Sequence, residues 1–286
     1  NIATKFAVLA TIITSSGLKI TELLRFPNAL HSFCWFPWIL LSITLINQNK
    51  NIYFSYLTIF ISSLMLLTAG YPYYIVYGLI LFSLYFIFVI LLNFQQKKEN
   101  QIKENLFIFI KCIIPSILAF ILASPWLFKI KELMNITRDR NLNDINFSLS
   151  GSSNITDQLG SWVFPPVANT EGWYYFGIII TLLIIFLFFT NFKKENVQNK
   201  YLFFFILLFV IVYQFSASQS SLIFSFIWTK IDFIQNFRFW IRSNIILVPI
   251  ISVLIAFSLE KFEIYYNNNY YYKISNTIKP NYCNKF

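Results

Sequence analysis

A run of 46 residues, 51–96, contains no charged side chain and is interrupted only by the sequence Ala69-Gly70-Tyr71-Pro72. A bilayer core about 30 Å thick takes roughly 20 residues of helix. Glycine and proline favour turns, because one tolerates positive φ and the other fixes φ. The run therefore predicts two membrane spans joined back to back by a tight turn, and the chain is interpreted as a polytopic membrane protein.

The composition supports this class. Hydrophobic residues make up 57% of the chain and charged residues 12%, against about 25% charged residues in globular domains. The net charge of +10 comes from lysines in short clusters between apolar runs, which is typical of cytoplasmic loops and argues against a nucleic-acid partner. Three scattered cysteines predict neither a disulfide framework nor a zinc site.

The first apolar run is short. It covers residues 6–18 in a sequence that begins with Asn1 and not with methionine, and it lacks the cleavage site of a signal peptide. We therefore expect the sequence to be a fragment that begins inside a longer membrane protein.

Apolar windows predict an all-α bundle of about seven or eight transmembrane spans. Pro37 and Pro115 are expected to kink their helices, which neighbouring helices can tolerate. The windows are a partial one at 2–16 and then 30–46, 53–67, 73–92, 106–127, 174–192, 201–215 and 243–259.

The short loops predict the orientation. The segments 95–103 and 193–200 each carry three lysines, which predicts that both are cytoplasmic. Alternation then places the turn at 69–72 and the long loops at 129–173 and 216–242 on the extracytoplasmic face, where their aromatic residues predict ordered structure. The expected organisation is a transmembrane bundle over 1–260 followed by a polar cytoplasmic tail over 261–286.

Arginine pairs are the first candidate binding residues. Arg238 and Arg242 directly precede the last span and are four residues apart, so they would share one face of a helix start. Cations are unfavourable at a helix N-terminus unless an anion lies there. The alternatives are a phosphate site and snorkelling to lipid phosphates. Arg138 and Arg140 form a second pair, either solvated or able to grip a phosphate through the guanidinium fork.

Aromatic and polar residues near the starts of helices form the second set of candidate binding residues. His31 opens the second span close to Trp35. Two roles are possible for it: membership of an aromatic belt at the membrane interface, or contact with a ligand. Tyr71 and Tyr73 flank Pro72, and the alternatives are a plain turn and the lining of a cavity. The P-loop, GxGxxG, HExxH, GxSxG and CxxC motifs of soluble enzymes are absent from the sequence, and no metal site is predicted.

Four motifs, in their order, resemble those of the bacterial YfhO-type membrane proteins of the GT-C glycosyltransferase superfamily. The resemblance covers the chain from about residue 6 to residue 259. The motifs are Trp35-Phe36-Pro37, Gly70-Tyr71-Pro72, Phe164-Pro165-Pro166 followed by Trp173-Tyr174-Tyr175-Phe176-Gly177, and Phe237-Arg238 with Arg242.

This resemblance implies a GT-C-like fold that transfers a sugar from a polyprenyl-phosphate donor to an envelope glycan or protein acceptor. The reaction would take place at the extracytoplasmic face of the bacterial cytoplasmic membrane. No cofactor is identified, and a divalent cation would depend on residues upstream of Asn1. The alternatives are a transporter or flippase of lipid-linked envelope precursors and a non-catalytic membrane scaffold. The implied roles are donor-phosphate binding by Arg238, Arg242, Arg138 and Arg140, sugar or lipid lining by His31, Trp35, Tyr71, Tyr73, Trp162, Trp173 and Tyr174, and general-base catalysis by Asp157 or Glu171.

Overall fold

The computed structural model of the chain describes residues 2–17, 20, 23–24, 26–95, 101–136, 145, 149, 155–164, 177–189, 197–217, 221–231, 235 and 240–278. Within these residues all regular structure is helical. The elements are α1 (Thr4–Ser15), α3 (Pro27–Phe33), α4 (Phe36–Asn47), α5 (Ile52–Thr68), α6 (Pro72–Gln95), α7 (Gln101–Ile136), α9 (Ile155–Gly160), α10 (Ile178–Phe189), α11 (Val197–Ser216), α12 (Leu222–Lys230), the 3₁₀ helix η2 (Trp240–Ile246) and α14 (Leu247–Ile278).

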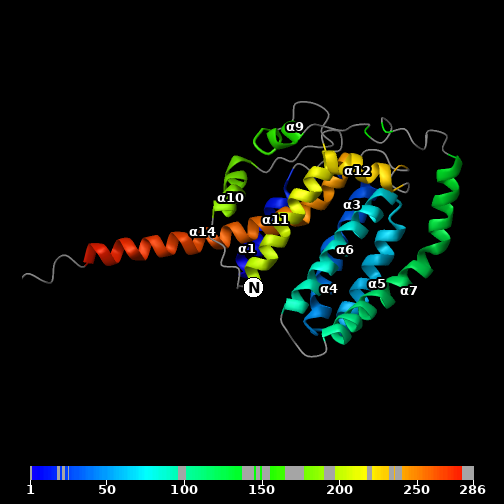
Figure 1. The fold of residues 1–286 in the computed structure, drawn as a ribbon, viewed down its shortest axis with the longest axis horizontal. Helices are drawn as coiled ribbons and strands as arrows, with labels where there is room; N and C mark the ends of the chain where they lie inside the picture. Colours follow the sequence, from blue (N-terminus) through cyan, green and yellow to red (C-terminus); the bar gives the residue numbers. More distant parts are fainter. Residues whose placement is uncertain are drawn as a thin grey trace, which may run out of the picture.

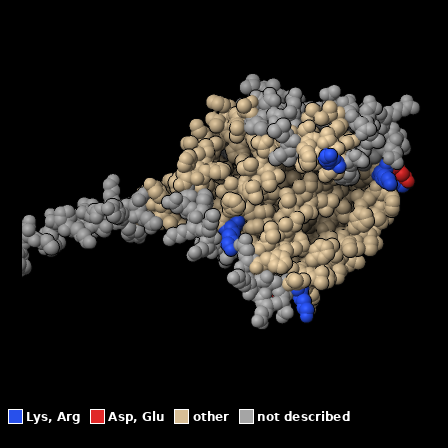
Figure 2. All heavy atoms as spheres, in the orientation of Figure 1, with Lys and Arg blue, Asp and Glu red and all other residues tan. Residues whose placement is uncertain are grey.

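Among the described residues, five helical segments are long and apolar enough to cross a membrane: the α3–α4 pair, α6, α7, α11 and η2 with α14. The apolar helices α1, α5 and α10 are shorter. The visible face of the described helices carries few charged side chains, and these lie near its edges (Figure 2). The predicted all-helical chain with several membrane-spanning helices is therefore confirmed, while the count of seven or eight spans stays a prediction.

The helices form two groups, which Figure 1 shows side by side. The first group contains α4, α5, α6 and α7, and the second contains α1, α10, α11 and α14. The helix η2 contacts α6, α11 and α14, so it joins the groups at one end. Aromatic rings join them further along, because Phe88 of α6 stacks on Phe204 of α11 with centroids 4.0 Å apart and planes 9° apart.

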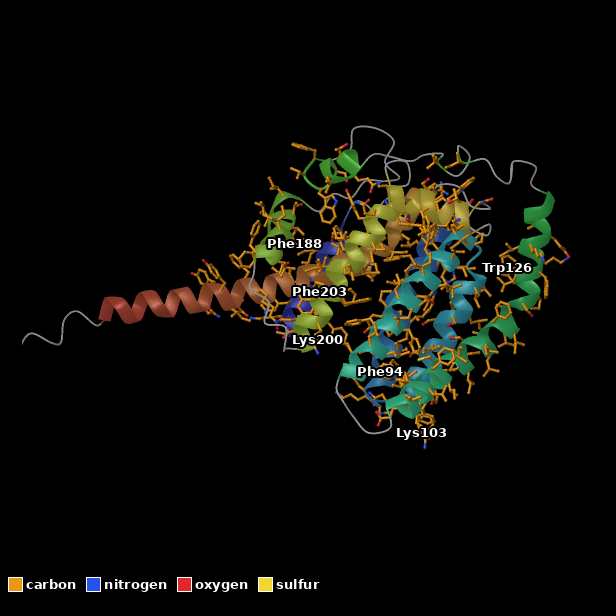
Figure 3. The ribbon with its side chains drawn as sticks, viewed as in Figure 1. Phe94, Lys103, Trp126, Phe188, Lys200 and Phe203 are labelled. Carbon is orange, nitrogen blue, oxygen red and sulfur yellow. The ribbon has the colours of Figure 1, made fainter. Side chains whose placement is uncertain are left out.

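The bundle has two ends, called here the Tyr71 end and the Asn93 end after the first and last turns of α6. At the Asn93 end, the Asn93 amide donates to Oδ1 of Asn47 at 2.8 Å and to Oδ1 of Asn105 at 3.0 Å, which ties α4, α6 and α7 together. Lys103 and Lys200, from different helices, lie toward this end, and Trp126 lies toward the other (Figure 3).

Several helix boundaries differ from the predicted ones, and α7 continues to Ile136 although its span was predicted to end at residue 127 and a loop to begin at 129. The span predicted over 30–46 consists of two helices, with a break between Phe33 and Phe36 and with Pro37 in the first turn of α4. The last span does not stop near residue 259, because α14 continues to Ile278. Neither glycine nor proline occurs from 250 to 279, and polar residues alone do not end a helix. The expected start of the tail therefore lies inside a helix.

Gly78 lets α6 approach its neighbours closely. A Cβ atom there would lie 3.0 Å from Phe36 Cε1 and 3.3 Å from Leu66 Cδ2, and small residues permit such approaches between membrane helices. We expect Gly78→Leu to lower the free energy of unfolding by about 1–3 kcal/mol, the usual cost of overpacking, with a smaller loss for Gly78→Ala. Equilibrium unfolding in mixed micelles measures this.

Gly160 provides the matched control, because a Cβ atom at that position meets nothing within 4 Å. Gly160→Ala should leave the unfolding free energy unchanged. Equal losses for the two alanine variants would contradict the packing argument.

Candidate functional site

Arg242 meets residues from two distant parts of the chain at the Tyr71 end. It lies in η2, and its Nη1 donates to the Tyr71 hydroxyl at 2.7 Å. Its guanidinium carbon lies 5.9 Å from the centroid of the Phe26 ring, within the range of a cation–π contact. The side chain is half-buried. Arg242 was expected at an α-helical start and lies in a 3₁₀ helix, and Arg238 is outside the described residues.

The turn before α6 positions Tyr71. Gly70 has φ +79°, a conformation that glycine adopts without strain, and Pro72 begins the helix. A Cβ atom added at Gly70 would lie 3.7 Å from the side-chain nitrogen of Asn28 and 3.7 Å from the Trp126 ring. The turn is therefore packed between the start of α3 and the far part of α7, which fixes where Tyr71 lies.

Aromatic rings connect this turn to the segment that carries Arg242. The Tyr71 and Tyr74 centroids are 4.8 Å apart, those of Tyr74 and Tyr77 are 5.9 Å apart, and those of Tyr77 and Trp240 are 5.8 Å apart. Tyr74, Tyr77 and Trp240 are buried. Because Trp240 is two residues before Arg242, this chain of rings sets the position of the guanidinium relative to the Tyr71 hydroxyl.

His31, Trp35 and Tyr73 lie at the same end. The His31 and Trp35 rings meet edge to face with centroids 6.3 Å apart, and the Tyr73 ring is 5.8 Å from that of Tyr71. His31 is exposed, whereas Trp35 and Tyr73 are half-buried. The indole N–H of Trp35 is buried and has no hydrogen-bond partner among the residues that the structure describes, although such groups usually find one.

Trp162 is placed differently from these residues. Its side chain is only 5% exposed, its ring packs against Phe209 with centroids 5.5 Å apart, and its carbonyl accepts from the Thr181 hydroxyl at 3.1 Å. Packing between α9, α10 and α11 therefore accounts for its position. The predicted site residues Arg138, Arg140, Glu171, Trp173, Tyr174 and Arg238 lie outside the described residues.

The helix α9 carries one polar contact that the sequence reasoning missed. Asp157 belongs to this helix, but its side chain is outside the described ones. The next residue, Gln158, is 2% exposed, and its Oε1 accepts from the Ser216 hydroxyl at 3.1 Å. This bond ties α9 to the end of α11 and so holds Asp157 near that helix.

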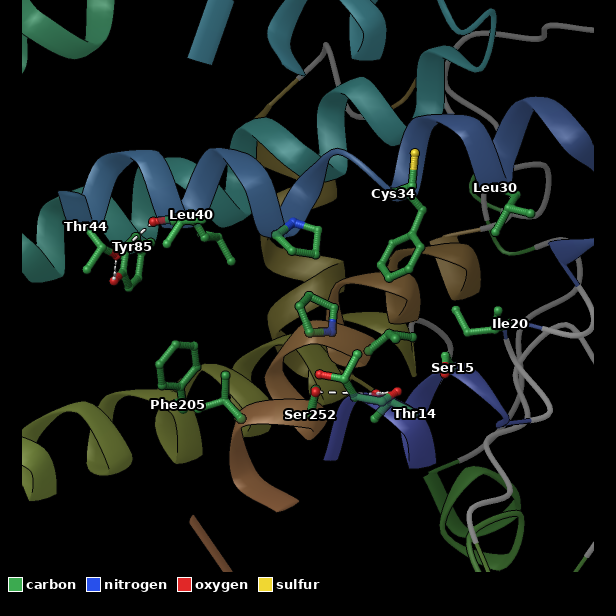
Figure 4. Close-up of a pocket in the computed structure, with 17 residues that line it drawn as sticks. Thr14, Ser15, Ile20, Leu30, Cys34, Leu40, Thr44, Tyr85, Phe205 and Ser252 are labelled. Carbon is green, nitrogen blue, oxygen red and sulfur yellow. Dashed lines mark hydrogen bonds between the residues drawn. The ribbon is translucent and has the colours of Figure 1, made fainter. Parts of the chain in front are cut away.

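A cavity of about 520 Å³ lies between the two helix groups (Figure 4). Two hydroxyl pairs border it: Thr14 donates to Ser252 at 3.3 Å, and Thr44 and Tyr85 share a hydrogen bond of 2.7 Å. Each pair lies within one group, linking α1 to α14 and α4 to α6. The remaining wall is mostly apolar and includes Leu30, Phe33, Pro37, Leu40, Phe205, Val248, Pro249 and Val253.

The cavity lies close in sequence to the Arg242 contacts. Leu30 lines it and is one helical turn from Phe26. Val248 lines it from the other side and follows Arg242 by six residues. No sequence pattern marked this cavity, because its wall combines residues of six helices, from α1 to α14.

This arrangement suits an amphiphile with an anionic head. A guanidinium and a phenol hydroxyl can bind phosphate oxygens, and an apolar cavity can hold a hydrocarbon chain. Within the described part of the chain, no three His, Cys, Asp or Glu side chains come together as metal ligands. The predicted bases Asp157 and Glu171 stay predictions, because their side chains lie outside that part.

The fold and the site define a chain whose described regular structure is helical, with several helices long and apolar enough to cross a membrane, one arginine among aromatic residues at one end and an apolar cavity between the two helix groups. Comparison of the chain with protein-family models, with characterised proteins and with solved structures gives no match.

Proposed function

We propose that this chain belongs to a GT-C-like, YfhO-type integral membrane glycosyltransferase that transfers a sugar from a polyprenyl-phosphate donor to an envelope glycan or protein. The proposal rests on the Arg242–Tyr71 hydrogen bond of 2.7 Å together with an apolar cavity of about 520 Å³, whose lining residues Leu30 and Val248 are close in sequence to the Arg242 contacts. A lipid-linked sugar needs this combination, because its phosphate requires a cation and its isoprenoid chain requires an apolar environment.

The chemistry follows from the charge that develops during transfer. When the bond from the sugar to phosphate breaks, the leaving polyprenyl phosphate gains negative charge. A fixed guanidinium beside it stabilises that charge more in the transition state than in the ground state. Arg242 has this role in the proposal, and Arg238 and the Arg138–Arg140 pair add further cations. Asp157 or Glu171 would act as the base.

The proposed orientation places the Tyr71 end outside and the Asn93 end in the cytoplasm of a bacterial cell. Its support is that Lys103 and Lys200 lie toward the same end of the bundle (Figure 3), as the positive-inside rule requires of cytoplasmic loops. We also propose that the shorter helices α1, α5 and α10 belong to further membrane spans. Together with the five long segments, they would give the predicted seven or eight spans.

A flippase of lipid-linked envelope precursors is the second candidate. The observation that favours it is the position of the cavity between two helix groups, because transporters bind their substrates at such interfaces. Each group keeps its own hydroxyl pair, Thr14–Ser252 or Thr44–Tyr85, so neither of these two bonds would break if the groups moved apart.

One experiment separates the two functions. The full protein is reconstituted in vesicles that contain a radiolabelled polyprenyl-phosphate hexose, and an envelope extract is supplied as acceptor. Transfer moves the label from lipid to acceptor and leaves free polyprenyl phosphate, which is the expected result. A flippase would move the intact labelled lipid to the opposite leaflet. Label that stays on the lipid in its original leaflet would contradict both functions and favour a scaffold.

A further inference from the structure

A buried lysine at the Asn93 end has only neutral partners among the described residues. Lys111 of α7 is 8% exposed. Its ammonium donates to Oδ1 of Asn49 at 3.2 Å and lies 4.0 Å from the centroid of the Phe107 ring. The ion pairs found within the described ranges are Lys5–Glu263 and Lys129–Glu132. Lys111 therefore has no carboxylate partner there, and burying a charge without a counter-charge is costly.

The position of Lys111 along α7 places it at the edge of the hydrocarbon layer. The stretch 112–128 contains no charged residue and ends at Lys129. At 1.5 Å per residue, about 27 Å separates Lys111 from Lys129, which is close to the thickness of a bilayer core of about 30 Å. The Lys111 ammonium is then level with the phosphate groups of the lipids.

Side chains next to Lys111 are exposed on the surface of the bundle. Phe107, which the ammonium covers, is 57% exposed, and Asn49 is exposed. Exposed apolar side chains continue into the uncharged stretch at Ile114 and Leu118, which lie three and seven residues after Lys111 and so on the same side of α7. Lys50 and Lys103 are also exposed near this end. A headgroup phosphate at Lys111 would thus have cations nearby and apolar surface for its acyl chains.

A second donor at this end lacks an acceptor. Asn105 is 6% exposed, and its buried Nδ2 has no hydrogen-bond acceptor in the described part of the chain, although its Oδ1 accepts from Asn93. Leaving a buried donor unpaired is costly, and Asn105 precedes Lys111 by about 9 Å along the helix. Phospholipid headgroups carry phosphate and ester or hydroxyl oxygens, which accept hydrogen bonds from such donors.

We propose that Lys111 and its neighbours at the Asn93 end bind the phosphate of an anionic phospholipid of the bilayer. The bound lipid supplies the counter-charge that the described protein residues do not, and it packs its chains on the exposed apolar strip of α7. Basic sites between membrane helices bind anionic headgroups in this way. The site lies at the opposite end from Arg242, so it is independent of the proposed transferase function.

Native mass spectrometry of the purified full chain, equilibrated with equal amounts of phosphatidylglycerol and phosphatidylcholine, tests the proposal. The wild type should retain phosphatidylglycerol in preference to phosphatidylcholine. Lys111→Met should weaken phosphatidylglycerol binding about tenfold, because a hydrogen bond to a charged group is lost. Lys129→Met removes the same charge from an exposed position near the other end of the same helix and should change the binding little. Arg242→Gln should leave it unchanged.

Asn49→Gly provides a second test that does not disturb packing. Asn49 has φ +52°, a conformation that glycine adopts easily, and the substitution removes the amide oxygen that competes for the ammonium. Phosphatidylglycerol should then bind at least as tightly as to the wild type. Equal retention of both lipids, an unchanged affinity in Lys111→Met, or weaker binding in Asn49→Gly would overturn the proposal. Displacement of the lipid by inorganic phosphate would show a site for soluble anions instead.

Discussion

Replacing Trp240 by alanine is expected to lower the free energy of unfolding by about 3–5 kcal/mol, the usual cost of deleting a buried aromatic side chain. Trp240 is 1% exposed. Its ring contacts those of Phe215, Phe224 and Tyr77, with centroids 5.1, 5.9 and 5.8 Å apart. These rings belong to α11, α12 and α6, so one side chain joins three helices. Between membrane helices packing contributes much of the stability, and the alanine variant would leave a cavity where they meet.

Equilibrium unfolding in mixed micelles measures the loss, with Trp38→Ala as the matched control. Trp38 of α4 is 45% exposed, and its truncation should change the unfolding free energy far less, as surface substitutions usually do. Trp240→Phe should give an intermediate loss because an aromatic ring remains. Similar losses for Trp240→Ala and Trp38→Ala would contradict the arrangement of rings around η2.

Local patterns predicted most helices, because helix formation in a bilayer depends on continuous apolar sequence. The uncharged run over 51–96 predicted α5 and α6, and Gly70 and Pro72 predicted the turn between them. The same reasoning placed the last boundary wrongly, since it equated the end of the apolar stretch with the end of α14. It also passed over Lys111 inside the span predicted over 106–127. A charge in a membrane span is a visible signal, and it marks the lysine used in the lipid proposal.

The contacts of the candidate site could be predicted only in part. The sequence singled out Tyr71 and Arg242 separately, each from its local context. It gave no reason for Tyr71 to meet Arg242, which is 171 residues away, or for Phe26 to approach the same guanidinium. Those contacts depend on how α3, α6 and η2 pack, and such packing follows from side-chain shapes across many helices. The cavity was missed for the same reason.

Arg242→Gln is expected to lower the turnover of transfer from a polyprenyl-phosphate sugar by about 10²–10³-fold, the usual effect of removing one donor that stabilises developing negative charge. Glutamine keeps a polar group and much of the length of the side chain, but it has no charge and no guanidinium fork. Arg242→Lys keeps the charge and should retain intermediate activity, because an ammonium cannot grip two phosphate oxygens in the same fixed plane. The vesicle transfer assay described above measures both variants.

Tyr71→Phe tests whether the hydrogen bond of 2.7 Å to the Tyr71 hydroxyl positions the guanidinium. It removes only that hydroxyl and should lower turnover about tenfold, since a hydrogen bond to a charged group is lost. The exposed Lys129, paired with Glu132, gives the control for charge, and Lys129→Gln should transfer at the wild-type rate.

The order of turnover among these variants distinguishes a specific role of Arg242 from a general effect of positive charge. If Arg242 acts on the leaving phosphate, turnover should fall in the order wild type, then Tyr71→Phe and Arg242→Lys, then Arg242→Gln, while the unfolding free energy of each stays near that of the wild type. Unchanged turnover in Arg242→Gln would remove Arg242 from the mechanism. If turnover fell equally in Lys129→Gln and Arg242→Gln, the loss of positive surface charge would explain both results. The proposal distinguishes the two residues, because it places only the Arg242 guanidinium beside the donor phosphate.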